Sequence, residues 1–208
     1  MGQAKRRVDV SRVVEVLVES GVIAGVSSAI RRLAGAASGS LGTDCYTHAI
    51  LAQSILDRLR VASVLKAGYA AWRVGDGNSD VVAHAPVPGI IPQPGGFIYH
   101  AWLEIGYHIL DFTTYLLPLK ASQLDALDGG STTVDWAPPY LLAQRKSVST
   151  MKAVTLGKRG LYYYEFVQSV TDIVLANAQA PDPDETEAAW MLFNNQDMVV
   201  VGPNDLRR

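Results

Sequence analysis

The sequence predicts an α+β fold, because apolar residues recur with a helical period near the N-terminus and with strand-like patterns through the middle of the chain. Residues 8–35 and 45–59 place valine, leucine, isoleucine and alanine at helical spacing. Residues 61–74 and 99–115 are instead rich in β-branched and aromatic residues, or alternate polar with apolar positions. Helices come first and strands mostly follow, which is an order typical of α+β proteins.

Composition narrows the class of protein. The chain has 208 residues, 49% of them hydrophobic and 18% charged, so we expect one globular domain over residues 1–208. A formal net charge of −2 gives no basic surface for nucleic acid or acidic lipid, and the lack of a long apolar run predicts no membrane span. A single cysteine, Cys45, cannot form an intramolecular disulfide and suits a reducing compartment. Acidic residues from Asp9 onward interrupt any signal peptide, so we expect a soluble cytoplasmic protein.

The N-terminal part is predicted to be helical. Residues 8–35 fit one or two amphipathic helices with a break near Gly21. After a Gly/Ser-rich loop, Thr43 or Asp44 can cap the next helix, which places Cys45 in its first turn. Unpaired backbone N–H groups and the positive end of the helix dipole favour a thiolate over a thiol at such a position.

The middle of the chain is predicted to form strands. Residues 61–74 fit one or two strands, and residues 80–96, with four prolines, form a long irregular connection. Residues 99–115 then form two short strands joined by a tight turn at Ile105–Gly106.

This hairpin is predicted to bring a histidine and a carboxylate together. With the turn at Ile105–Gly106, residue 104 pairs with residue 107, and His100 lies directly opposite Asp111 on the same face. Their Cβ atoms are then roughly 4.5–5.5 Å apart. A carboxylate at that distance can hold an imidazole in one tautomer and stabilise its charged form.

The C-terminal part is predicted to mix strands and helices. In chain order we expect a loop or short helix at 116–127, a rigid turn at 136–140, strands at 140–144 and 148–156, a helix at 162–178, a linker at 180–184, a helix at 185–193 and a strand at 199–201.

Cys45, His100 and Asp111 together have the residue types of a cysteine nucleophile site. Such a site needs a thiolate, an imidazole that shares its proton, and a polar group that orients the imidazole. Backbone N–H groups of Cys45 and Tyr46, at the start of a helix, can form part of an oxyanion hole.

Each of these residues also has a simpler interpretation. A lone cysteine is most often a small buried hydrophobe, and a histidine facing a carboxylate on a strand is often a structural pair. His48 lies one helical turn beyond Cys45 and is an alternative partner for the thiol, although packing or capping suits it better. No pair of histidines has metal-ligand spacing, so no metal site is expected.

The sequence resembles the transglutaminase-like cysteine peptidase superfamily, with its papain-like Cys-His-Asp arrangement. The resemblance rests on Asp44-Cys45-Tyr46-Thr47-His48-Ala49 at a helix start, on the strand His100-Ala101-Trp102-Leu103-Glu104, and on the closing Asp111-Phe112-Thr113. It implies a catalytic core over residues 40–115, with the cysteine-bearing helix packed on an antiparallel sheet, and residues 116–208 complete the fold.

The resemblance also implies the roles of the site residues. Cys45 is then the nucleophile, His100 the general base and acid, and Asp111 the residue that orients the imidazole. Tyr46 lies at the oxyanion or substrate side, and Trp102 packs near the site at its substrate-binding side. No cofactor is implied, and the sequence leaves the oligomeric state open.

Three functions fit these features. The first is hydrolysis of a peptide or amide substrate through a thioester on Cys45, which we expect because the chain has no acidic loop of the calcium-binding type. The second is transfer of the acyl group to an amine, as in a transglutaminase or acyltransferase. The third is a catalytically inactive binding module that keeps the fold, with the Tyr162-Tyr163-Tyr164 run on its partner surface.

Overall fold

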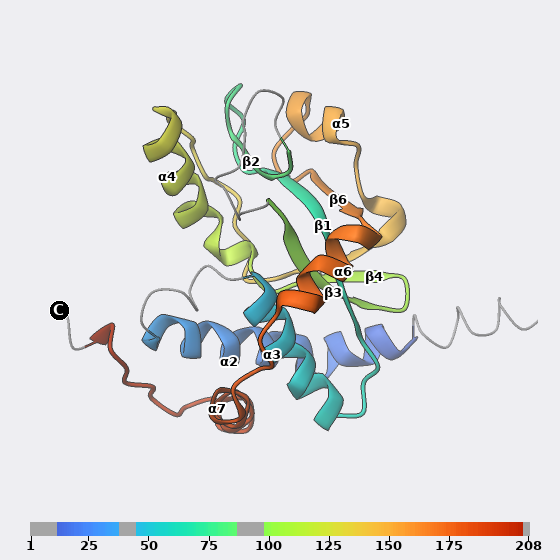
Figure 1. Cartoon of the computed structure of the whole chain (residues 1–208), viewed down its shortest axis with the longest axis vertical. Coiled ribbons are helices and arrows are strands. Elements are labelled where there is room, and N and C mark those ends of the chain that lie inside the picture. Colours follow the sequence, from blue (N-terminus) through green and yellow to red (C-terminus); the bar gives the residue numbers. More distant parts are fainter. Residues whose placement is uncertain (1–11, 38–44, 87–97, 206–208) are drawn as a thin grey trace, which may run out of the picture.

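An antiparallel sheet occupies the centre of the protein, with helices packed around it (Figure 1). The structure, a computed structural model, describes residues 12–37, 45–86 and 98–205. In these residues the sheet has six strands: β1 (Val64–Arg73), β2 (Val81–His84), β3 (His100–Ile105), β4 (His108–Asp111), β5 (Leu141–Gln144) and β6 (Tyr162–Phe166). The fold is therefore α+β, as the sequence predicts.

Strand β1 pairs with three other strands of the sheet, along both of its edges. One edge pairs with β6. The other pairs with β3 along its first half and with β2 along its second half, and β4 and β5 continue the sheet beyond β3. Consequently β2 ends and β3 begins at neighbouring places on β1, where His84 pairs with Ala70 and His100 with Gly68.

Helices lie on the faces and ends of the sheet. They are a first helix (Arg12–Glu19), α2 (Val22–Ala36), α3 (Cys45–Arg58), α4 (Leu117–Asp128), α5 (Met151–Leu156), α6 (Gln168–Asn177) and α7 (Pro183–Asn194), with short 3-10 turns at Thr114–Leu116 and Arg145–Ser147. In the view of Figure 1, α2, α3 and α7 lie together below the sheet, and α4 and α5 lie at its other end. Gly21, with a φ of 73°, separates the first two helices, which confirms the predicted break.

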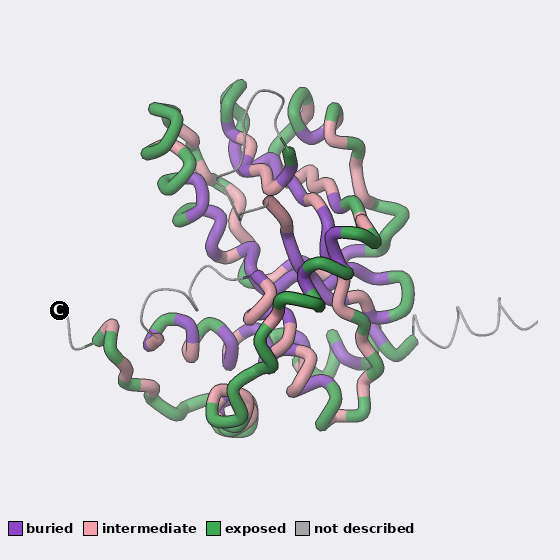
Figure 2. The backbone as a smooth tube through the Cα atoms, viewed as in Figure 1, coloured by how far each residue is buried: buried purple, intermediate pink, exposed green. Residues whose placement is uncertain are grey.

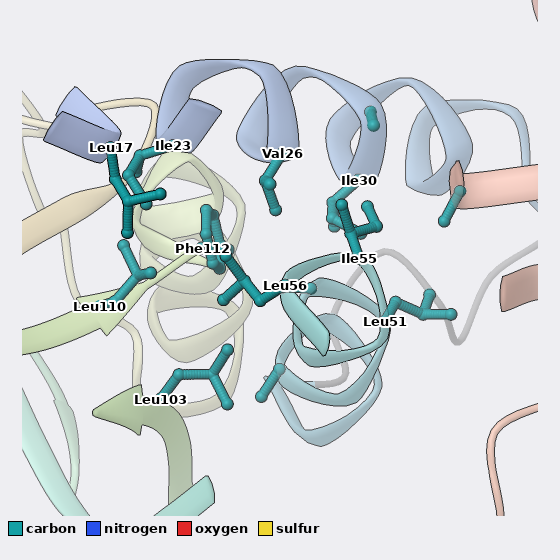
Figure 3. Close-up of a cluster of buried hydrophobic side chains, with 14 of the residues drawn as sticks. Leu17, Ile23, Val26, Ile30, Leu51, Ile55, Leu56, Leu103, Leu110 and Phe112 are labelled. Atoms are coloured by element: carbon teal, nitrogen blue, oxygen red, sulfur yellow. The ribbon is translucent and has the colours of Figure 1, made fainter. Parts of the chain in front are cut away.

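The main core lies between α2, α3 and one face of the sheet (Figure 3). Val26 and Ile30 of α2 point towards Ile55 and Leu56 of α3, all of them almost wholly buried. Leu103 of β3 belongs to the same cluster. Each such side chain contributes about 1.5–3 kcal/mol by leaving water, so this cluster fixes α3 on the sheet. Figure 2 shows that the buried residues run through the central strands and the inner sides of these helices.

A second cluster fills the opposite face of the sheet. It contains Trp72, Trp102 and Tyr164, together with Leu117 from α4. Residues 100, 102 and 104 therefore share one face of β3, and residues 101, 103 and 105 face the helices, in agreement with the alternation of the sequence.

Two predicted elements of the C-terminal part are wrong in type. Residues 151–156 form helix α5 rather than a strand, because the Thr150 side chain accepts a hydrogen bond from the Ala153 N–H and caps the helix. Residues 162–166 form strand β6 rather than the first part of a helix, and only 168–177 is helical. The three consecutive tyrosines favour a strand, and β1 offers an edge for it.

Two further predictions are wrong, one because a partner strand is present and the other because none is assigned. Residues 81–84, expected to be irregular, pair with β1 as β2. Residues 199–201, expected to be a strand, have no strand assignment, and Val199 and Val201 are 82% and 71% exposed. A strand needs a neighbour for its backbone groups, and local preference cannot supply one. The predicted cap at 43–44 and most of the 80–96 connection lie outside the described residues.

Within the described residues, no single helix has the length and apolar composition that a membrane span requires. Arg12–Glu19 and Val22–Ala36 reach them only when they are counted together, across a bend of 61°.

Candidate active site

His100 and Asp111 are in contact in the buried centre of the sheet. His100 begins β3 and Asp111 ends β4, and their exposed fractions are 0% and 1%. Nε2 of His100 donates a hydrogen bond to Oδ2 of Asp111 over 2.8 Å. Since a carboxylate accepts this bond, Nε2 carries the proton in the neutral imidazole, and Nδ1 is then the basic nitrogen.

The predicted register of this hairpin is wrong by two residues. The turn is Gly106–Tyr107, one residue later than predicted, and Gly106 has a φ of 58°, which glycine adopts without strain. Continuing the register places Asp111 opposite Trp102 and diagonal to His100. Side chains alternate with a period of two, so a shift of two residues leaves them on the same face. The imidazole and the carboxylate are therefore in contact in the observed register, as they are in the predicted one.

Cys45 approaches this pair from the helix side. It is the first residue of α3, is 6% exposed, and packs with Ala67, Ala101 and Val174. Its side chain interacts with the His100 ring, although no hydrogen bond of regular geometry joins the two. Nδ1 of His100 is buried without a hydrogen-bond partner in the described part of the chain. The nitrogen that Asp111 leaves unused is thus the one available to the thiol.

The carboxylate of Asp111 accepts four hydrogen bonds. Its Oδ2 atom accepts from His100 and from the Tyr164 hydroxyl, the latter over 2.7 Å. Its Oδ1 atom accepts from the backbone N–H and the hydroxyl of Thr113, over 2.7 and 2.8 Å. The Tyr164 hydroxyl in turn accepts from the indole N–H of Trp72 over 2.9 Å. These bonds fix the carboxylate and hence the imidazole.

Electrostatics favour the charged forms of the pair. Burial alone would raise the pKa of Asp111, but the charge and hydrogen bond of His100, together with Lys120 and Tyr164, hold that pKa well below its usual range. Burial alone would likewise lower the pKa of His100, yet Asp111 and then Cys45 raise it above its ordinary value. The imidazolium is therefore stabilised at neutral pH, which is what a neighbouring thiolate requires.

Aromatic rings enclose the imidazole. Trp102 stacks on it with a centroid distance of 6.3 Å, and Trp72 meets it edge-on at 4.9 Å. Both indoles are buried, with exposed fractions of 1% and 0%. In this conformation Trp102 contacts His100 from inside the protein and presents almost no surface to a substrate. Trp72 is a contact that the sequence did not reveal, because its strand is remote from the hairpin.

His84 is a second histidine at the site. It ends β2, its ring lies 5.6 Å from that of His100, and its Nδ1 donates to the Tyr99 carbonyl over 3.3 Å. Burial, and then the positive charges of Lys120 and His100, lower the pKa of His84 to about 3. This histidine is therefore neutral at physiological pH. No sequence signal placed it here, because β2 was not predicted.

His48, the alternative partner of the thiol, contacts another residue. It is fully buried on α3, and its Nε2 lies 2.9 Å from the hydroxyl of Tyr115. No group of three histidine, cysteine or acidic side chains with metal-binding geometry occurs within residues 12–37, 45–86 and 98–205.

A cavity of about 520 Å³ is lined by residues next to Cys45 and His100 in the chain, although neither Cys45 nor His100 is among its lining residues. Its wall includes Tyr46, which follows Cys45, and Tyr99, which precedes His100. Both tyrosines and Val174 also pack in the cluster that holds Cys45. The other walls come from α6, from the segment after it, and from the start of α7. Tyr46 thus lines a cavity of ligand size.

The fold also occurs in a solved structure. A crystal structure described only as a genomics target superposes with a TM-score of 0.58 at 19% sequence identity, and the match covers 85% of this chain and 80% of that chain. At this identity the likeness concerns the fold alone. No protein-family model and no curated protein matches the sequence.

Proposed function

We propose that the protein is a cysteine-dependent hydrolase of the transglutaminase-like, papain-like type, acting on a peptide or amide bond. The observation that carries the proposal is the orientation of His100, whose Nε2 is bound to Asp111 while its Nδ1 remains for Cys45. The cysteine-bearing helix on an antiparallel sheet, and the His-Ala-Trp and Asp-x-Thr motifs, support the same reading.

In the proposed reaction, the thiolate of Cys45 attacks the carbonyl carbon of the substrate. His100, as imidazolium, donates its Nδ1 proton to the departing amine, and a thioester on Cys45 results. Water then attacks the thioester while Nδ1 accepts its proton, so that the acid is released and the thiolate returns. Asp111 remains ionised throughout and stabilises each imidazolium.

The first turn of α3 offers groups for the developing negative charge. Backbone N–H groups at a helix start have no partner within the helix, and the helix dipole is positive there. In the proposal, the N–H group of Cys45 donates to the oxyanion of the tetrahedral intermediate.

The cavity beside Tyr46 and Tyr99 is the proposed substrate cleft. Asp182 and Glu185 are among its lining residues, and no lysine or arginine is among them. Asp182 also caps α7, where its side chain accepts from the Asp184 N–H, so part of its charge offsets the helix dipole. The remaining negative charge favours a substrate with a neutral or cationic group on this wall.

Trapping of the thioester tests the proposal. Incubation with the activated ester p-nitrophenyl acetate should acetylate Cys45, as found by mass spectrometry of the peptide that contains it, and hydroxylamine should remove the acetyl group. His100→Ala should slow acetylation strongly, whereas Lys146→Ala, at an exposed residue away from the site, should leave it unchanged. Acetylation of lysines alone in the folded protein would refute the proposal and favour the inactive binding module.

The fate of the thioester separates hydrolysis from acyl transfer. With an added primary amine such as methylamine, a hydrolase should still release mainly acetate, because water has access to the thioester. Release of mainly the amide would assign the protein to the acyltransferase or transglutaminase alternative instead.

A further inference from the structure

Lys120 is a buried cation close to the proposed site. It lies on α4 and is 4% exposed, although lysine is seldom buried without a partner. Its Nζ donates to the Thr113 hydroxyl over 3.3 Å and lies 5.3 Å from the centre of the Trp72 ring. Burial lowers the pKa of this lysine, and an ammonium group in such surroundings is costly unless nearby negative charge compensates it.

The compensating charge is that of Asp111. The Thr113 hydroxyl accepts from Lys120 and donates to Asp111 Oδ1 over 2.8 Å, so it links the ammonium to the carboxylate. Lys120 also interacts electrostatically with Cys45. The remaining titratable neighbours are His84 of β2 and His100 of β3, both of which carry no negative charge.

We propose that Lys120 is a positioning residue of the site, whose ammonium, held by Thr113 and Trp72, supplies the second positive charge for Asp111 and the Cys45 thiolate. The inference rests on the proposed function. With Lys120, the reactive form has two positive groups, imidazolium and ammonium, and two negative groups, carboxylate and thiolate. Without it, the buried site has a net negative charge and binds a proton more readily.

Neutral replacements of Lys120 have a defined effect on the reactivity of Cys45. The rate of alkylation by iodoacetamide, measured from pH 4 to 10, should rise first as the thiolate forms beside the imidazolium and again as the imidazolium loses its proton. In Lys120→Met both steps should move to higher pH, by about one pH unit, because loss of a nearby cation makes both groups retain protons more strongly.

Two further variants separate charge from structure. Lys120→Gln, also neutral, keeps a donor for Thr113 and should behave as Lys120→Met does, so it carries the test if the methionine variant fails to fold. Lys120→Arg keeps the charge and should leave both steps near their wild-type positions. A uniform fall in rate at all pH values in the neutral variants, with neither step displaced, would overturn the inference and leave Lys120 as a packing residue.

The wild-type profile separates this inference from the proposed function. If the wild type lacks the step at low pH, the ion pair itself is absent and the proposed function fails. If the wild type has that step and the neutral variants retain it unchanged, only the role of Lys120 is refuted.

Discussion

Replacing Tyr164 with phenylalanine removes one oxygen atom that serves two buried partners. The hydroxyl donates to Asp111 over 2.7 Å and accepts from the Trp72 indole over 2.9 Å, and all three side chains are at most 5% exposed. A hydrogen bond to a charged group contributes about 1.5–3 kcal/mol, and a buried donor left without an acceptor costs about 1–3 kcal/mol. Because both effects arise at one atom and overlap, we expect the free energy of unfolding to fall by about 3 kcal/mol.

Urea unfolding followed by tryptophan fluorescence measures this loss. With a slope of about 2–3 kcal/mol per molar urea, the midpoint should fall by about 1 M. Tyr163→Phe is the matched control, because the neighbouring hydroxyl bonds to Glu165 at the surface, and it should cost less than about 0.5 kcal/mol. Equal losses in the two variants would refute the assignment of Tyr164 to the buried network.

The same loss should depend on pH in a defined way. The folded-state pKa of Asp111 is held below its ordinary value of about 3.9, so the contribution of the ionised carboxylate is present above that value and is lost as the pH falls through the lowered pKa. The difference between wild type and Tyr164→Phe should therefore be constant from about pH 5 to 8 and shrink in acid.

Three further variants test other parts of the structure. Burial, aided by nearby positive charge, lowers the pKa of His84 to about 3, so the free energy of unfolding of the wild type should fall as the pH drops from about 6.5. His84→Gln should lose less stability over the same range. Equal losses of stability in the two proteins between about pH 7 and 4.5 would contradict this. Gly68→Ala places a Cβ atom 1.9 Å from a backbone oxygen of β6, so we expect a loss of more than about 3 kcal/mol in thermal or urea unfolding, and a stable variant would contradict the close pairing of β1 with β6. A methanethiosulfonate reagent with a trimethylammonium group should modify Cys45 faster than the reagent with a sulfonate group, because the cleft is negatively charged. Glu185→Gln should reduce the ratio of these two rates more than Glu187→Gln does. An unchanged ratio of rates would refute the charge assigned to the cleft.

The central contact of the site was predictable from sequence because it is local. His100 and Asp111 are eleven residues apart in one hairpin, and the alternation of polar and apolar residues places both on one face. The turn lies one residue later than predicted, which shifts the register by two residues and leaves that face unchanged. The helix that begins at Cys45 was equally clear, because its apolar face repeats over fourteen residues.

The residues that surround the contact were not predictable, because they come from remote segments. Tyr164 reaches Asp111 only because β6 pairs with β1. The sequence pattern instead predicted a helix for the residues of β6. Lys120 looks like an ordinary exposed lysine on a short helix, and only the packing of α4 buries it. His84 depends on a strand of four residues whose own pattern is weak. Such contacts follow from tertiary pairing, which single-sequence patterns do not encode.

Alkylation of Cys45 by iodoacetamide in the folded protein, in wild type and His100→Ala, measures whether Cys45 and His100 form a reactive thiolate–imidazolium pair. An ordinary thiol, with a pKa of about 8.5, reacts slowly near pH 6. We expect rapid reaction at pH 6 in the wild type and a large loss in His100→Ala, with both proteins folded. Equal slow rates in the two proteins, or reaction only after unfolding, would contradict this expectation.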